Sequence, residues 1–290
     1  MAKVDRDEAT GTETTGHEWD GIKELNTPLP RWWLNTFYGT IAFAAVYCVL
    51  YPSLPGWGGV LGFSSRAQVQ EQLADWRKSQ QAFIDKINAT PVAEIRKQAD
   101  LLEFANAGGA AAFKVNCVPC HGAGAQGGHG YPNLADNDWL WGGKVDDIYK
   151  TLQHGIRYTA DPDTRDSQMP AFGDGILEPA KIADVSDYVL TLQGDKVDDQ
   201  AAVERGKAIF AEQCTSCHGE DGKGNHDVGA PNLTDKIHMY ATTKEQIAAQ
   251  ITKPRMGVMP AWAHRLDDST IKSLAVYVHS LGGGEVDATN

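Results

Sequence analysis

Residues 32–51 form an apolar run of twenty positions without a charged side chain. As an α-helix this run rises about 30 Å, which matches the hydrocarbon thickness of a bilayer. Aromatic residues near both ends resemble interfacial anchors, and a proline follows the run; these are Trp32, Trp33, Tyr47, Tyr51 and Pro52. The run is too long for a signal-peptide core, and no small-residue cleavage site follows it. We therefore predict a transmembrane helix over residues 32–52, preceded by a segment over residues 1–31.

The chain between this run and the first cysteine motif has the pattern of a linker. Gly and Pro are frequent in residues 53–63, and Ser65 followed by Gln68 resembles a capping box that opens a helix to about Asn88. A Thr-Pro pair then indicates the start of another helix. We expect residues 53–99 to form linker helices that lift the next domain off the membrane.

Two C-x-x-C-H strings, Cys117–His121 and Cys214–His218, lie in surroundings that repeat. A glycine eight residues before each string and a phenylalanine four residues before it share one face of a helix. After each string come Pro-Asn-Leu, then Met-Pro-Ala-aromatic, then an amphipathic helical pattern. The matched positions are Gly109 and Gly206, Phe113 and Phe210, Pro132 and Pro231, Met169 and Met259, Phe172 and Trp262, and Tyr188 and Tyr277. The repeat predicts one all-α domain present twice, over residues 100–197 and 198–290.

The C-x-x-C-H spacing is that of covalent haem attachment. Two cysteines one helical turn apart can form thioethers with one haem, and the adjacent histidine can reach the iron. A redox disulfide and half of a zinc site also use C-x-x-C. A redox pair would not need an adjacent histidine twice, and zinc would need further clustered Cys or His. We therefore predict two covalently bound haem c groups in class I cytochrome c domains, held by Cys117, Cys120, Cys214 and Cys217.

His121 and His218 are the predicted proximal iron ligands. A ligating histidine usually donates its other ring N–H to a backbone carbonyl or a carboxylate. The carbonyls of Pro132 and Pro231, in the matched Pro-Asn-Leu strings, are candidates for this role. The alternative is that both are ordinary loop prolines.

Met169 and Met259 are the predicted sixth ligands, because both lie in matching Met-Pro-Ala-aromatic strings. A thioether ligand raises the haem potential relative to a second imidazole. A lone methionine is more often a core residue, and Met256 is the competitor in the second domain. We expect each methionine to serve the haem of its own half. The other histidines have no counterpart at the matching place, and we interpret them as surface or structural: His129, His154, His226, His238, His264 and His279.

Composition and charge narrow the function further. The net charge is −12, and the acidity is concentrated in residues 100–290. An acidic surface disfavours nucleic acid and favours a basic partner. The fifth cysteine, Cys48, lies alone in the apolar run, so a disulfide framework is not expected. With both axial positions filled, neither iron would have a site for a substrate, so the pattern predicts electron transfer.

The chain resembles the di-haem subunit III (FixP-like) of cbb3-type cytochrome c oxidases. The string GHEWDGIKELNTPLPRWWLNTFY, residues 16–38, resembles the N-terminal anchor of that family most closely. The resemblance implies a subunit that accepts electrons from a cytochrome c or a cytochrome bc1 complex. It would pass them to a mono-haem cytochrome c subunit and then to the haem–copper subunit that reduces oxygen and pumps protons. It would have no substrate site of its own.

The expected location is the bacterial inner membrane, with one span. Haem is attached to C-x-x-C-H outside the cytoplasmic membrane, so both haem domains are expected in the periplasm. Lys23 and Arg31 on one side of the run and Arg66 on the other give a weak bias for a cytoplasmic N-terminus. The alternatives are a cytochrome subunit of another periplasmic or membrane dehydrogenase, and a stand-alone anchored carrier or haem-based gas sensor.

Overall fold

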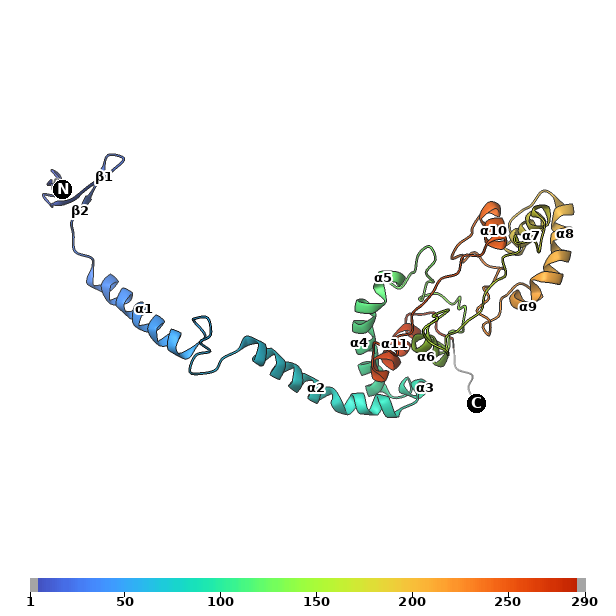
Figure 1. Cartoon of the computed structure of the whole chain (residues 1–290), viewed down its shortest axis with the longest axis horizontal. Coiled ribbons are helices and arrows are strands. Elements are labelled where there is room, and N and C mark those ends of the chain that lie inside the picture. The colour runs from blue at the N-terminus through green and yellow to red at the C-terminus, as the bar shows by residue number, and fades with distance from the viewer. Residues whose placement is uncertain (1–4, 286–290) are drawn as a thin grey trace. The chain divides into compact units, whose positions relative to one another are not determined.

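The computed structural model describes residues 5–285, which divide into two units at residue 79. The first unit holds a β-hairpin and a long apolar helix, and the second holds both cysteine motifs. Helices dominate the described chain (Figure 1), as the all-α prediction requires.

The hairpin of the first unit consists of β1 (Thr14–Trp19) and β2 (Ile22–Leu25), which pair antiparallel. Asp20 and Gly21 join the strands with φ values of 52° and 82°. Two positive φ angles in a two-residue loop are typical of a type I′ turn, which Asp-Gly favours. The hairpin was not predicted from the sequence, although the Asp-Gly pair is its strongest local signal.

Helix α1 (Arg31–Leu50) agrees with the predicted transmembrane helix. Within residues 5–285 it is the helix that is long and apolar enough to cross a membrane, and none of its residues is buried. It ends where Tyr51 becomes extended, because a residue before a proline is disfavoured in the α region.

Helix α2 (Ser65–Ala89) follows, close to its predicted bounds. The remaining helices are α3 (Val92–Ile95), α4 (Ala99–Asn116), α5 (Val118–His121), α6 (Val145–His154), α7 (Pro179–Leu192), α8 (Gln200–Gln213), α9 (Thr215–His218), α10 (Lys244–Thr252) and α11 (Asp268–His279).

Two hydrophobic cores organise the second unit. In the first core α4 packs against α11, and α6 also contacts α11. Its buried side chains include Phe113, Ile148 and Leu274. In the second core α7 packs against α8 and α10, around Val185, Phe210 and others. Figure 1 shows α11 beside α4, and α7 beside α8, although α4 and α11 lie at opposite ends of the haem-bearing sequence.

The closing helices are therefore exchanged between the two sequence halves. The chain builds α4–α6 in the first core, crosses to build α7–α10 in the second, and returns to complete the first with α11. The repeat boundaries 100–197 and 198–290 stay a prediction about sequence units. Each core contains residues from both sequence repeats, because the second core is inserted into the first.

Backbone hydrogen bonds hold the exchanged segments at equivalent places. Trp262 N donates to Leu152 O at 2.9 Å, and Phe172 N donates to Ile251 O at 3.2 Å. Trp262 and Phe172 end the matched Met-Pro-Ala-aromatic strings, and each bonds to the helix of the other half. The two crossings thus have the same local geometry.

Glycines allow the paired helices of each core to touch. A Cβ at Gly109 would overlap the Ser273 carbonyl oxygen, and one at Gly206 would overlap the Asp184 carbonyl oxygen. Beside Gly109, Phe113 packs on Tyr277, with ring centroids 5.5 Å apart. In the second core Phe210 packs on Tyr188 in the same way. The sequence repeat of Gly and Phe is therefore a helix-contact motif.

We predict that Gly109→Ala destabilises the fold by about 1–3 kcal/mol, because the added methyl group forces α4 and α11 apart. Gly108→Ala is the matched control: a Cβ there lies 3.9 Å from Ser273, so the better helix propensity of alanine should leave stability unchanged or raised by up to about 1 kcal/mol. Denaturant unfolding of the haem-loaded chain measures both. Equal effects of the two substitutions would contradict the helix contact.

Candidate haem-binding sites

Each cysteine motif forms one helical turn at the end of a longer helix. In the first, Cys120 N and His121 N donate to Cys117 O at 3.1 and 2.9 Å. The second repeats this with Cys217 N and His218 N on Cys214 O, at 3.2 and 2.9 Å. The turn brings the two sulfur atoms to one side, with the histidine directly after them.

Backbone carbonyls orient both histidines. The Nδ1 atoms of His121 and His218 each lie 3.1 Å from the carbonyl oxygens of Pro132 and Pro231, respectively. These contacts confirm the prediction made from the Pro-Asn-Leu strings. When Nδ1–H donates to the carbonyl, Nε2 carries no proton, and its lone pair is available to bind iron. Burial lowers the pKa of both imidazoles despite this bond, which favours the neutral form.

A glycine after each motif makes the close approach possible. Gly127 and Gly224 have φ values of 70° and 82°, and a Cβ at either would overlap the backbone just before or at the proline. Their N–H groups donate to His121 O and His218 O, both at 2.8 Å. These two glycines were not among the predicted site residues. The signal available was a glycine six residues after the histidine in both halves.

The cysteines do not have the chemistry of a redox dithiol. Burial, followed by the charge of the second cysteine, raises the pKa of Cys117 and of Cys214 to about 11. Catalytic C-x-x-C thiols instead have lowered pKa values, because the thiolate is the reactive form. The structure therefore disfavours the redox-disulfide alternative.

The two motifs face two separate cavities, and the methionines in them are exchanged. Met169 lines a cavity of about 550 Å³ together with Cys214, Cys217 and His218. Met259 lines a cavity of about 90 Å³ together with Cys117 and His121. The structure therefore places each methionine beside the cysteine motif of the other half, which differs from the expectation that each serves the haem of its own half.

The physical reason is the backbone pairing of the returning chain. Met259 N donates to Ile156 O at 3.0 Å, and Ile156 N donates to Met259 O at 2.9 Å. Ile156 follows α6 of the first core, so this pair fixes Met259 opposite His121. Met256, the predicted competitor, lines the larger cavity with Met169, as do Met239 and His238.

The residues present fit haem c by their donor chemistry. Within residues 5–285, the buried side-chain polar atoms without a partner are Asn106 Oδ1, Trp141 Nε1 and Arg165 Nε. Trp141 lines the smaller of the two cavities. The guanidinium carbon of Arg165 lies 5.4 Å from the centre of the Trp141 ring. Two adjacent buried donors without acceptors suit a carboxylate, which haem carries as propionate.

Comparisons with known proteins agree with this geometry. Residues 11–58 match the N-terminal domain of cytochrome oxidase-cbb3, FixP. Residues 107–193 match cytochrome c, and residues 201–278 match cytochrome c oxidase, cbb3-type, subunit III. The chain is 51% identical to the cbb3-type cytochrome c oxidase subunit FixP of Sinorhizobium medicae, over 96% of this chain and 97% of the relative. It is 50% identical to the subunit CcoP of Azospirillum brasilense, over 98% of this chain and all of the relative.

The chain belongs to the FixP/CcoP family of cbb3-type cytochrome c oxidase subunits. As a member of this family it carries two covalently bound haem c groups, one for each cytochrome c domain. The family resemblance and the all-α fold expected from the sequence are both confirmed. Helix α1 lies within the matched FixP N-terminal domain, which supports its role as the membrane anchor.

In this FixP/CcoP chain the two cavities share one wall. The segment after the first motif lines both of them, through Pro132, Asn133, Asp138 and Leu140. Burial first, then the charges of Asp235 and Asp136, raises the pKa of Asp138 to about 6. A partly buried carboxylate thus lies between the two haem sites. Sequence analysis had no means to single it out, because it lies between two halves that pack together only in the fold.

The raised pKa of Asp138 makes stability depend on pH. The folded state binds this proton more tightly than the unfolded chain, so stability is lost as pH rises from about 4 through about 6. We predict that Asp138→Asn stabilises the haem-loaded chain at pH 7.5 by about 1–2 kcal/mol and changes little near pH 4. Denaturant unfolding at both pH values measures this, with the exposed Asp174→Asn as the control. The same gain at both pH values would contradict the assignment.

Proposed function

We propose that this chain is the membrane-anchored electron relay of a cbb3-type cytochrome c oxidase in aerobic respiration. The observation that carries the proposal is the pair of cavities, each with a Cys-x-x-Cys-His turn and a methionine, joined by one wall. Haem c, when bound, supplies an iron that gains and loses one electron. The neighbouring cavities favour transfer between the two sites within one chain.

His121 with Met259, and His218 with Met169, are the proposed axial ligands of the two irons. Cys117 and Cys120 would attach one haem, and Cys214 and Cys217 the other. With a histidine and a methionine each holding an iron, no ligand position would remain for oxygen or a substrate, which supports electron transfer without a substrate site. Methionine raises the reduction potential relative to a second histidine.

The proposed partners follow from the family. A cytochrome c or a cytochrome bc1 complex would donate electrons. A mono-haem cytochrome c subunit and the haem–copper catalytic subunit would receive them, within a proton-translocating oxidase. No nucleic acid is expected as a partner. The match of residues 11–58 to the FixP N-terminal domain favours this oxidase over another dehydrogenase.

The proposed location is the bacterial inner membrane, crossed once by α1. The hairpin of β1 and β2 would lie on the cytoplasmic side, and both haem domains in the periplasm. The support is chemical, since haem is joined to C-x-x-C-H outside the cytoplasmic membrane. The placement of Lys23 and Arg31 before the span agrees with this orientation.

We predict that Met259→Ala lowers the potential of the haem attached through Cys117 and Cys120. The expected drop is on the order of 0.1 V, a fraction of the roughly 0.8 V range that axial ligands control. Redox titration in a Cys214→Ala/Cys217→Ala background, where only the first haem remains, isolates this effect. Met169→Ala in the same background is the control and should leave that potential unchanged.

The reciprocal background, with Cys117→Ala and Cys120→Ala, should respond to Met169→Ala and not to Met259→Ala. In the chain with both haems, a density map of either methionine variant shows which iron has lost its sulfur ligand. A loss at the haem of the same sequence half would refute the exchanged ligation.

We also predict that oxidation of a basic cytochrome c by the intact oxidase slows as ionic strength rises. The haem-bearing part of this chain is acidic, and salt screens attraction over about 8–10 Å at 0.10–0.15 M. Stopped-flow kinetics between about 20 and 200 mM salt measure the effect. A neutral small-molecule reductant serves as the control, because its rate should not change. Salt-independent oxidation of the cytochrome would exclude an acidic docking face.

A further inference from the structure

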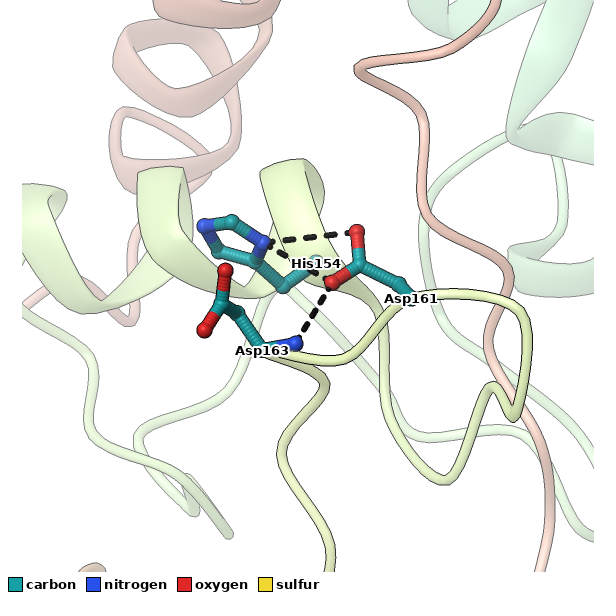
Figure 2. Close-up of side chains that lie close together, drawn as sticks. All are labelled: His154, Asp161 and Asp163. Carbon is teal, nitrogen blue, oxygen red and sulfur yellow. Dashed lines mark hydrogen bonds and ion pairs between the residues drawn. The ribbon is translucent and has the colours of Figure 1, made fainter.

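A cluster of His and Asp side chains lies at the end of α6, apart from the cysteine motifs. Among residues 5–285, His154, Asp161 and Asp163 each offer a ligand atom, and these atoms lie within 4.8 Å of one another. Figure 2 shows the three side chains together, His154 on the last turn of α6 and both aspartates on the loop that follows.

Asp161 is the centre of this cluster. Its side chain is only 7% exposed, and His154 Nδ1 lies 3.2 and 3.4 Å from its two carboxylate oxygens. Asp163 N donates to Asp161 Oδ1 at 2.9 Å, which bends the loop around the carboxylate. Ligands of a tetrahedral ion with bonds of about 2.0–2.1 Å lie about 3.3–3.4 Å apart. The His154–Asp161 spacing is that of a hydrogen bond, and it also fits two ligands of one metal ion.

A second histidine reaches the same carboxylate from a distant part of the sequence. His264 Nε2 lies 3.6 Å from Asp161 Oδ2. His264 belongs to the returning chain between Met259 and α11, and its side chain is 62% exposed, so it has room to adjust. His154, Asp161 and Asp163 thus form the cluster, and His264 contacts its central carboxylate from the returning chain.

The electrostatics of the place favour a cation. Burial raises the pKa of Asp161, but hydrogen bonds from Asp163 N and His154 outweigh it, so the pKa lies below its ordinary value and the carboxylate is ionised. The C-terminus of α6 adds partial negative charge. The arginines close to the cluster in sequence are engaged elsewhere. Arg157 donates to Gly257 O and Ser167 O, Arg165 pairs with Asp147, and Arg265 lies over the Trp262 ring.

We propose that His154, Asp161, Asp163 and His264 bind a divalent transition-metal ion of the zinc type. Imidazole nitrogen with carboxylate oxygen suits zinc, nickel or copper, whereas calcium requires six to eight oxygen ligands. The ion takes the place of the hydrogen between His154 Nδ1 and Asp161, and that proton is released to solvent or held at Nε2. Water completes the coordination on the exposed side.

A metal ion at this site links the segments through which the chain leaves the first core and returns to it. It joins the end of α6, the loop that leaves the first core, and the segment that returns with Met259. The ion therefore stabilises the closure of the first haem pocket without touching the haem. This role is additional to electron transfer and does not depend on which partners the chain has.

Zinc titration of the haem-loaded, full-length chain in detergent, stripped of metal with a chelator, tests the site. Calorimetry and elemental analysis should find one zinc ion per chain that Asp161→Asn weakens at least about tenfold. His154→Gln and His264→Gln should weaken it too. Asp166→Asn in the same loop and the exposed His129→Gln are matched controls and should bind zinc as the parent chain does. Zinc should also raise the unfolding temperature of the parent chain and not that of Asp161→Asn.

Asp163→Asn changes an exposed carboxylate, so it keeps the test decisive if Asp161→Asn fails to fold. The proposal would be overturned if zinc binding were unchanged in all three single variants, Asp163→Asn, His154→Gln and His264→Gln. So would a parent chain that binds no zinc, since the cluster would then be an ion-pair network only. Tighter binding of calcium than of zinc would refute the proposed class of metal.

Discussion

The pairing of Met259 with Ile156, through two backbone hydrogen bonds, is the interaction on which the haem-bearing unit depends. It brings the returning chain onto α6, sets a methionine opposite His121, and leads α11 onto α4. Nearby, Trp262 N donates to Leu152 O in the first core, and Phe172 N makes the matching bond to Ile251 O in the second core. Each closure uses residues from the other sequence half, and both halves contribute to the lining of each cavity.

The exchange also explains why the two cavities have a wall in common. Two independent cytochrome domains on a flexible linker would face each other at variable distances. Here Asn133 and Asp138 belong to both cavities, so the separation of the two haem sites is set by covalent structure and packing. The cost of this arrangement is a carboxyl group, Asp138, held where its charge is disfavoured.

Much of the local structure was predictable from the sequence, because its determinants are local. The span, the cysteine turns and the proline carbonyls that bind His121 and His218 follow from composition, spacing and repetition. The partner of each closing segment was not predictable. Both Met-Pro-Ala-aromatic strings have the same pattern, so either could complete either core, and the decision lies in long-range pairing. The site around Asp161 was missed for a similar reason, since His154 and His264 have no counterparts in the repeat and meet only after the chain returns.

The insertion of one core within the other has a consequence for biosynthesis. As the nascent polypeptide emerges, all the helices of the second core are made before α11, which the first core needs. A chain that stops after α10 would therefore contain all the helices of the second core but lack α11, which completes the first core. The haem site nearest the membrane anchor in sequence is the last to be completed.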